Sequence, residues 1–436
     1  MCGNYLWIGE IVKESLKNKI IYQIFPRQYS SKHNFEGIIE DLDRLEKLKV
    51  DYIYLLPIHP IGKLARKGSV GSPYSIYDYR SINRDYGTAK DFLKLLSECH
   101  KRGIKVIMDI VFNHTSRDSV LVNESNEWFC HDEEGNLKNR VGDWTDIVDF
   151  NFEHEETYAY LINTLKMYTQ IGVDGFRCDV AFMVPYDFWK IAIPICKEIN
   201  NDLIFIAESA ETSFIKYLKD QKYDVITDSE LFNCFDVLYD YDIYIYLQNY
   251  INKKGTLRRY IEEVVNQEGR YNKNYCKLRH LENHDCGSAF QMLKDKNKVC
   301  NALALQAFLR GMFFLYNGIE CLVDHRLDLF EIDEINWNDK HDDIEDLIFK
   351  LNMLKKEKVF NDGIFDADYL NDDAATLRFY NEEVEYYGIF NFDYETDVKV
   401  NLKDGKYLNI LNEEYIEINN QIIKSNKEPI IIKIEK

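Results

Sequence analysis

Short apolar runs rich in Ile, Val, Phe and Tyr recur along the first three quarters of the chain, and many are followed by a segment with helical periodicity. In one clear case Thr88 is the expected helix cap and Gly103 the expected stop. The apolar residues between them recur at helical spacing: Phe92, Leu95, Leu96 and Cys99. The eight runs expected to form strands are 20–25, 51–56, 104–112, 173–181, 203–209, 224–232, 276–284 and 312–318.

Strands that alternate with helices indicate parallel βα units. Eight such units over roughly 340 residues predict a closed (β/α)8 TIM barrel, with the surplus length in loops. We expect this catalytic barrel to occupy residues 1–359. It would include a short loop domain after the third strand, at about 115–150.

The pattern changes after the last expected helix, near 341–359. From about residue 360 the chain reads as short alternating strands without a convincing helix. This pattern predicts an antiparallel β domain, a small β-sandwich, over residues 360–436.

Composition limits which partners the protein can bind and in which compartment it is expected. The formal net charge of −20 argues against nucleic acid and anionic membrane surfaces as partners, since both need a basic face. The N-terminal sequence lacks the basic and apolar regions of a leader, and no run of 18 apolar residues occurs. The 10 Cys show no CxxC pair, which is typical of reduced thiols. We therefore expect a cytoplasmic protein that spans no membrane; its oligomeric state stays open.

Polar residues gather where the expected strands end, which is where the loops of a barrel form a pit. Arg177 and Asp179 are two residues apart and therefore share a strand face. The other polar residues at strand exits are Asp109, Asn113, His114, Glu208, Glu282, Asn283, His284 and Asp285. A carboxylate at one exit is usually a loop cap or a surface ion pair. Carboxylates at three exits that face one pit suggest function, because burying acids together is costly.

Paired carboxylic acids are the working groups of glycoside hydrolysis, in which one attacks or activates water and the other protonates the leaving oxygen. The segments that carry them resemble, in order, the four conserved regions of the α-amylase family (glycoside hydrolase family 13). They read "DIVFNH", "GVDGFRCDVA", "FIAES" and "HLENHD". Residues 71–88 and 144–156 resemble further family segments, and the resemblance spans roughly 19–320.

The resemblance implies a role for each matched residue. Asp179 would be the nucleophile that forms a covalent glycosyl-enzyme, and Arg177 would keep it ionised. Glu208 would be the general acid and then the base, and Asp285 would bind sugar hydroxyls and favour the distorted ring. Asp109 is expected to be a structural partner within the site.

The resemblance also implies substrate contacts. His114 and His284 would donate hydrogen bonds to hydroxyls of the same sugar, and Tyr74 would stack on its face. A lone histidine is usually structural, and only the motif context of these two favours substrate binding.

Calcium binds many relatives, and Asn113 matches a residue that often contributes a ligand. Phe182 and Met183 stand where many relatives have a cationic residue or His, which departs from the pattern of a calcium site. We therefore expect that no cofactor is required, with Ca²⁺ bound through Asn113 as the alternative.

The sequence predicts a retaining hydrolase, an α-amylase cleaving α-1,4-glucosidic bonds of maltooligosaccharides or of starch and glycogen. A 4-α-glucanotransferase and a glucosidase specific for α-1,6 bonds or short oligosaccharides are the alternatives. A non-catalytic amylase-like binding protein would lack a catalytic carboxylate, and all three are present: Asp179, Glu208 and Asp285.

Overall fold

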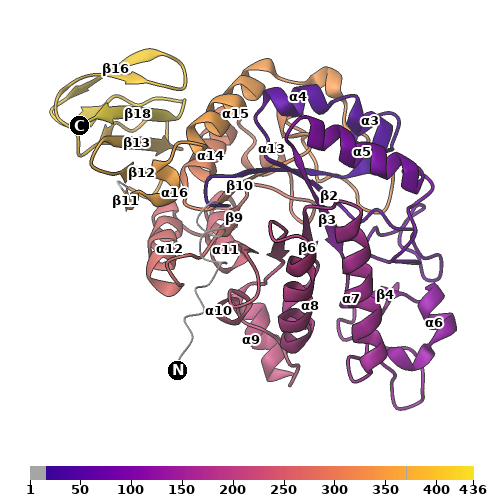
Figure 1. Cartoon of the computed structure of the whole chain (residues 1–436). Coiled ribbons are helices and arrows are strands. Elements are labelled where there is room, and N and C mark those ends of the chain that lie inside the picture. Colours follow the sequence, from indigo (N-terminus) through magenta and orange to yellow (C-terminus); the bar gives the residue numbers. More distant parts are fainter. Residues whose placement is uncertain (1–15, 370) are drawn as a thin grey trace, which may run out of the picture.

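The computed structural model describes residues 16–369 and 371–436, and its centre is a closed barrel of eight parallel strands (Figure 1). Around the barrel the order is β1-β10-β9-β8-β7-β6-β3-β2, so each strand lies beside the next barrel strand in the chain. The strands are β1 (Ile20–Ile24), β2 (Tyr52–Leu55), β3 (Lys105–Ile110), β6 (Gly175–Cys178), β7 (Ile204–Ala207), β8 (Val237–Tyr239), β9 (Lys277–Arg279) and β10 (Met312–Tyr316). This architecture confirms the predicted TIM barrel.

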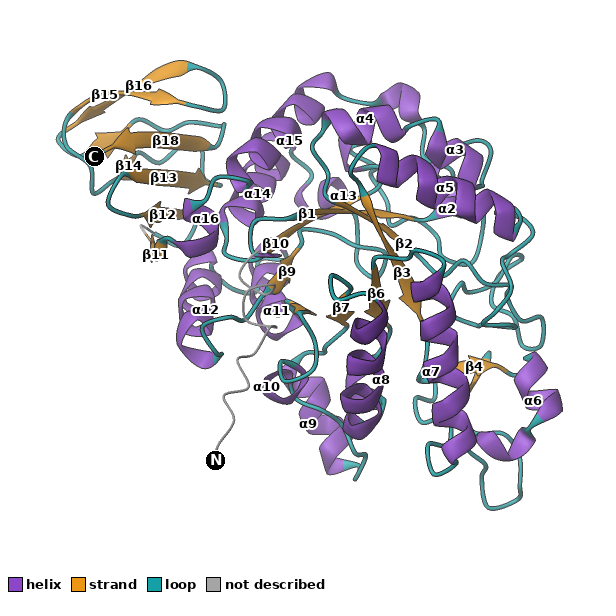
Figure 2. Cartoon of the chain, in the orientation of Figure 1, coloured by secondary structure: helices purple, strands orange, loops and turns teal. Residues whose placement is uncertain are grey.

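Alternation along the strands separates two buried layers. Ile107, Ile206 and Leu278 belong to the cluster inside the barrel. Val106 and Phe205, each one residue away from an inward position, pack in the second buried layer. Figure 2 shows the helices arranged around the barrel strands. Helices therefore surround a barrel whose interior is filled by side chains.

The helices of the barrel and its loops vary widely in length. They are α2 (Pro26–Tyr29), α3 (Phe35–Ile39), α4 (Leu42–Lys47), α5 (Ala89–Lys101), α6 (Val120–Glu124), α7 (Glu155–Gln170), α8 (Tyr186–Ile199), α9 (Thr212–Asp220), α10 (Asp228–Leu231), α11 (Tyr241–Ile251), α12 (Leu257–Arg270), α13 (Ala289–Leu293), α14 (Lys296–Phe308), α15 (Asp342–Lys355) and α16 (Val359–Asp362). Short 3₁₀ helices are η1 (Asn126–Trp128), η2 (Ala181–Met183), η3 (Ile319–Cys321) and η4 (Trp337–Asp339). No helix in the described part of the chain is long and apolar enough to cross a membrane. The expectation that the chain lacks a leader rests on N-terminal residues that lie outside the described part of the chain.

One predicted strand is wrong. The run 224–232 does not enter the barrel, because Thr227 and Glu230 form a capping box that starts α10. The sixth barrel strand is β8, a few residues later, and all three of its residues are buried. A short apolar run fits a strand or a buried helix turn equally well, and here the cap decided.

The segment between β3 and α7 forms the expected excursion from the barrel. It contains α6, η1 and a two-stranded antiparallel sheet of β4 (His114–Ser116) and β5 (Ile147–Asp149), in which His114 pairs with Asp149. In Figure 1 the excursion lies on the side of the barrel opposite the C-terminal sheet. We call residues 114–149 the excursion below.

The C-terminal strands form an eight-stranded antiparallel sheet. The strands are β11 (Ile364–Tyr369), β12 (Ala374–Tyr380), β13 (Val384–Asn391), β14 (Val398–Lys399), β15 (Gly405–Asn409), β16 (Glu414–Asn419), β17 (Ile422–Ile423) and β18 (Ile430–Glu435). One residue pair, Asn409 with Ile432, joins the four strands β11, β12, β13 and β18 to the other four. Ile389 of β13 and Ile418 of β16 share one buried cluster, so the sheet folds over its own core. Phe308 at the end of α14 packs edge-on against Phe390 and joins this domain to the barrel.

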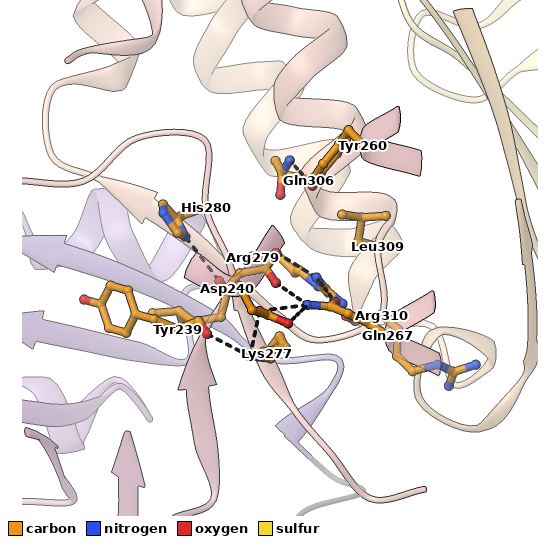
Figure 3. Close-up of polar contacts among 12 residues, drawn as sticks. Tyr239, Asp240, Tyr260, Gln267, Lys277, Arg279, His280, Gln306, Leu309 and Arg310 are labelled. Carbon is orange, nitrogen blue, oxygen red and sulfur yellow. Dashed lines mark hydrogen bonds and ion pairs between the residues drawn. The ribbon is translucent and has the colours of Figure 1, made fainter. Parts of the chain in front are cut away.

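A group of buried charges joins β9 to helices α11 and α12. We call it the β9 charge cluster; it consists of Asp228, Asp240, Asp242, Gln267, Lys277 and Arg279. Figure 3 shows four of its members, Asp240, Gln267, Lys277 and Arg279. The Lys277 ammonium lies 2.5 Å from Asp228 and 2.9 Å from Asp242. Arg279 donates to Asp240 at 2.7 Å. Gln267 donates to both Asp240 and Asp242 at 2.9 Å, so each buried carboxylate has a cation and further donors.

Candidate active site

The guanidinium of Arg177 lies at the centre of the carboxylates that the sequence placed at the strand ends. The register of β3 and β6 pairs Asp109 with Arg177. Nη1 of Arg177 lies 2.8 Å from Asp179 and 3.0 Å from Asp109, and Nη2 lies 3.0 Å from Glu208. Arg177 and Asp109 are fully buried. One buried cation therefore serves three carboxylates, and the negative charge is in excess.

Two tyrosines and Arg177 bind the carboxylate of Asp109. Tyr54 donates a hydrogen bond to its carboxylate at 2.6 Å and Tyr74 donates one at 3.0 Å. With Arg177 added, both of its oxygens have partners and none faces the pocket described below. This placement agrees with the structural role expected for Asp109.

Glu208 is held from two sides. One of its oxygens pairs with Arg177, and the other accepts a hydrogen bond of 2.6 Å from the backbone N–H of Val180. Val180 has φ +43° and ψ +40°, a left-handed conformation that a β-branched residue rarely adopts. Such a residue costs about 1–3 kcal/mol and persists where surrounding contacts impose it. The strained residue directly follows Asp179, so it couples the positions of Asp179 and Glu208.

His284 takes part in a chain of hydrogen bonds across the site. Its ring stacks on Tyr74 at 5.4 Å, and its Nε2 lies 2.5 Å from the Tyr74 oxygen. The Tyr74 hydroxyl hydrogen goes to Asp109, so we assign the donor at this contact to Nε2–H of His284. Nδ1 then accepts from Gln23 Nε2 at 3.0 Å. A sugar hydroxyl that binds Nε2, as the sequence predicted, must replace Tyr74 there.

Asp285 points into open space. Its side chain is 43% exposed, and its nearest partners are His284 Nε2 at 3.2 Å and Arg326 at 4.0 Å. Its backbone N–H donates to Asn283 at 2.9 Å, which fixes the turn that presents it. A carboxylate with this much free surface can accept hydrogen bonds from a ligand.

His114 and Asn113 face different surroundings. The His114 ring lies 5.5 Å from the ring of Trp144, and its Nδ1 lies 3.1 Å from the Asn113 amide nitrogen. The Asn113 amide oxygen accepts a hydrogen bond from Arg140 and does not line the pocket. Of the two, only His114 is placed to contact a substrate.

Burial and nearby negative charges shift the pKa values of the carboxyl groups in the site. Burial, together with the negative charge of Glu208, raises the pKa of Asp179 well above its ordinary value, and Arg177 opposes this shift. Burial also raises the pKa of Asp109 to about 6, while Arg177 and the hydrogen bonds from Tyr54 and Tyr74 limit the rise. The sequence predicted that Arg177 keeps Asp179 ionised. Arg177 does favour the ionised form of Asp179, but its guanidinium is shared among three carboxylates. Burial and Glu208 therefore prevail, and the pKa of Asp179 in the empty site stays above its ordinary value.

The two histidines are neutral at neutral pH. Burial lowers the pKa of His114 to about 4, and burial with the nearby charge of Arg177 lowers the pKa of His284 well below its ordinary value. Each ring therefore offers one N–H donor and one acceptor.

A pocket of about 640 Å³ opens above Arg177. This volume is typical of sites for small organic ligands. Six of the seven residues predicted to act on substrate line it: Tyr74, His114, Asp179, Glu208, His284 and Asp285. Arg177, the seventh, lies buried beneath. The structure therefore brings together the catalytic and substrate-binding residues predicted from the sequence.

The sequence interpretation missed several residues of the site. Gln23 could have been found, because it is a lone amide in the apolar run of β1 and lies on a barrel strand. Phe214, Lys67 and Arg326 line the pocket from loops and α9, where no periodic signal marks an inward position. Arg140 carried no signal at all within the irregular excursion.

A TIM barrel with acids at three strand ends, one shared arginine and a sugar-sized pocket defines the class of carbohydrate-active enzymes that work with paired carboxylates. Family models agree. The "Alpha amylase, catalytic domain" model matches residues 23–144, and the "Bacterial Alpha amylase C-terminal domain" model matches residues 367–432.

Similar solved structures span the whole chain. An alpha-amylase from Lactobacillus plantarum is 37% identical, with a TM-score of 0.92, over 97% of this chain and 100% of that one. A maltogenic alpha-amylase from Thermotoga neapolitana is 30% identical, with a TM-score of 0.85, over 97% and 99%. The chain belongs to the α-amylase family.

Among curated relatives, an alpha-1,4-glucan:maltose-1-phosphate maltosyltransferase from Picrophilus torridus is 26% identical over 404 residues, which is 85% of this chain. The chain spans 60% of that relative's length and 58% of that of an alpha-amylase from Dictyoglomus thermophilum. The activity of either relative as a whole protein is therefore not transferred to this chain directly.

Proposed function

We propose that this protein is a retaining hydrolase that cleaves α-1,4-glucosidic bonds of maltooligosaccharides or of starch and glycogen. The observation that carries the proposal is the sharing of one guanidinium: Asp179 and Glu208 lie on the two amino groups of Arg177, at the floor of an open pocket. This sharing keeps the two carboxyls close together. Retaining enzymes need them about 5–5.5 Å apart, whereas inverting enzymes leave a wider gap of about 6.5–9.5 Å for a water.

In the proposed mechanism Asp179 attacks the anomeric carbon while Glu208 donates a proton to the departing glycosidic oxygen. The bond to the leaving sugar breaks, and a glycosyl ester forms on Asp179. Glu208, now a carboxylate, then takes a proton from water, which attacks the same carbon and releases Asp179.

The surrounding groups prepare these steps. Arg177 stabilises the negative form of Asp179 when the ester is released. Glu208 accepts contacts at both oxygens in the empty site, whereas a general acid must donate. We therefore expect substrate binding to release one of the contacts to Arg177 or Val180.

Substrate recognition falls to the residues above the acids. We propose that Asp285 accepts hydrogen bonds from sugar hydroxyls, that His114 and His284 donate to them, and that the ring of Tyr74 packs on the sugar face. The carboxylate of Asp285 supports the first role, because 43% of its side chain is exposed and open to a ligand.

A 4-α-glucanotransferase is the second candidate, and the similarity to maltosyltransferases favours it. The same residues would form the glycosyl-enzyme, and a sugar hydroxyl would replace water as the acceptor. Two solved structures that are 30% or more identical over 97% of the chain are named amylases, and this is why we place hydrolysis first.

We also propose that the protein acts in the cytoplasm. Cys99, Cys178 and Cys196 are free buried thiols, which suits a reducing compartment.

Product analysis tests the reaction. The protein is incubated with maltoheptaose, and the anomeric form of the new reducing ends is followed by NMR. Early release of the α-anomer supports the retaining mechanism, and release of the β-anomer contradicts it. With maltotriose alone, longer oligosaccharides would identify a transferase.

Two variants serve as controls for the product assay. Asp179→Asn should release no product, and Asp242→Asn, in the β9 charge cluster, should keep the wild-type product pattern. Absence of any product from wild-type protein on α-1,4 and α-1,6 substrates would favour a binding protein.

A further inference from the structure

We propose that the guanidinium of Arg140 is a built-in cation that fixes the excursion to the active-site strand ends and makes a calcium ion there unnecessary. Arg140 lies in the excursion, far in sequence from the strand ends that it contacts. It is a positioning residue, because its partners lie beside the substrate pocket and it does not line the pocket itself.

Each nitrogen of the guanidinium binds a different segment of the chain. Nη2 donates to the amide oxygen of Asn113, at the exit of β3. Nε donates to Asp149, at the end of β5, at 2.7 Å. Nη1 donates at 3.2 Å to the carbonyl oxygen of Met183, four residues after Asp179. The backbone N–H of Arg140 also donates to Asp149, at 2.9 Å.

Removing Arg140 from its pair with Asp149 would be costly, because the carboxylate left behind is buried. The Asp149 side chain is 1% exposed, and that of Arg140 is 19% exposed. A carboxylate so deeply buried needs a cation or several donors, and Arg140 supplies both a charge and two N–H groups to the same oxygen. The other oxygen of Asp149 is buried without a hydrogen-bond partner among the described residues.

The residues around Asn113 do not fit a bound calcium ion. Calcium takes six to eight oxygen ligands at about 2.3–2.6 Å. Here the oxygens of Asn113, Asp149 and Met183 all point at the guanidinium, so an ion on the same oxygens would occupy the space of Arg140. In the described residues no group of three or more His, Cys, Asp or Glu side chains is arranged to hold a metal.

The consequence for the active site is positional. Asn113 precedes His114, and His114 pairs with Asp149 in the small sheet. Met183 closes the short turn that begins after Asp179. By holding these segments together, Arg140 sets where His114 and the strained turn at Val180 lie.

Arg140→Ala offers a direct test, because it would leave the oxygens of Asn113, Asp149 and Met183 without their donor. Such a set of hard oxygens around an empty space is what calcium prefers. We expect this variant to lose about 5 °C in Tm or more, and millimolar CaCl₂ to restore most of the loss. Isothermal titration with CaCl₂ should show one site in the variant and none in the wild type.

Arg117→Ala is the matched control. Arg117 is in the same excursion and donates to the carbonyl oxygens of Leu137 and Thr145 and to the amide oxygen of Asn139, with no carboxylate among these partners. Its removal should lower Tm without creating a response to CaCl₂. Arg140→Lys keeps a charge near Asp149, and we expect a lower Tm that CaCl₂ does not raise.

If Arg140→Ala does not fold, the calcium content and the Tm of the wild-type protein still test the proposal. Wild-type protein with stoichiometric calcium after purification, or with a Tm that falls in a chelator, would overturn the proposal. So would Arg140→Ala with an unchanged Tm, or with a reduced Tm that CaCl₂ raises no more than it does for Arg117→Ala. These readouts measure metal binding and unfolding, so they stand apart from the proposed α-glucan hydrolysis.

Discussion

Two groups of buried charges in this protein have similar parts and different balances. Arg177 is shared by three carboxylates, Asp109, Asp179 and Glu208, at the floor of a pocket. In the β9 charge cluster, Lys277 and Arg279 serve three carboxylates with the help of Gln267, away from that pocket.

The balance between burial and neighbouring charges decides whether the pKa of each carboxyl group is raised or lowered. Burial favours the neutral form of Asp242, but Lys277 and the hydrogen bonds from Lys277, Gln267 and Tyr271 outweigh it, so the pKa of Asp242 is lowered. At Asp228 and Asp240, in the same cluster, burial prevails and the pKa is raised. At Asp179 burial and Glu208 outweigh the single shared arginine, and its pKa is raised. Buried charge by itself therefore does not mark a functional site. An excess of carboxylates beside an open pocket does.

Asp179→Asn and Asp242→Asn should separate the two groups most strongly in activity. We expect Asp179→Asn to lower kcat on maltoheptaose by about 10³-fold or more, because the amide cannot form the glycosyl ester. Asp242→Asn should leave kcat of the folded enzyme unchanged. Comparable kcat losses in both variants would show that the β9 charge cluster is also part of the catalytic machinery.

Asp242→Asn should have the largest effect on stability. Removing one partner of a buried pair leaves Lys277 less compensated, and we expect the free energy of unfolding to fall by about 3 kcal/mol. A lowered folded-state pKa contributes stability above the ordinary pKa of Asp, and this contribution is lost as pH falls through the folded value. Urea unfolding of wild type and variant should therefore converge at acidic pH; a constant difference would contradict the assigned shift.

Removing one tyrosine hydroxyl from each group, at Tyr74 and at Tyr271, should give a smaller difference between the two groups. Tyr74→Phe removes a hydrogen bond to Asp109, and Tyr271→Phe removes one of 2.9 Å to Asp242. We expect Tyr74→Phe to lower kcat/KM about tenfold, since a hydrogen bond to a charged group is involved. Tyr271→Phe should lower the free energy of unfolding by about 1.5 kcal/mol and leave kcat/KM unchanged. The reverse pattern would mean that the roles of the two groups are misassigned.

Asp179→Asn should also stabilise the protein, by about 1 kcal/mol at neutral pH. The raised folded-state pKa of Asp179 means that ionising it in the folded site costs stability above that pKa. As pH falls through the folded value the wild type takes up a proton, and the advantage of the variant should disappear. Calorimetric Tm values across this range test the sign; a destabilised variant at neutral pH would contradict it.

The fold was predictable where periodicity was long or where motifs marked strand ends. Seven of the eight expected strands, all but the run 224–232, contain a barrel strand of the structure. Short runs rich in β-branched and aromatic residues, bounded by polar residues, are typical of strands. The run 224–232 failed because a four-residue capping signal competed with a short apolar pattern. The C-terminal strands were expected, but their joining into one sheet depends on pairing between distant segments.

The amino-acid sequence by itself determined which side chains stand at the strand ends, since alternation places Arg177 and Asp179 on one face and the barrel gathers the ends of its strands. Only the tertiary structure decided how their charges are shared. Burial and the nearby Glu208 raise the pKa of Asp179, and Arg177, shared among three carboxylates, does not outweigh them. The path of the excursion likewise brings Arg140 to Asn113, Asp149 and Met183. Such pairings join residues far apart in the chain, where no local pattern records them.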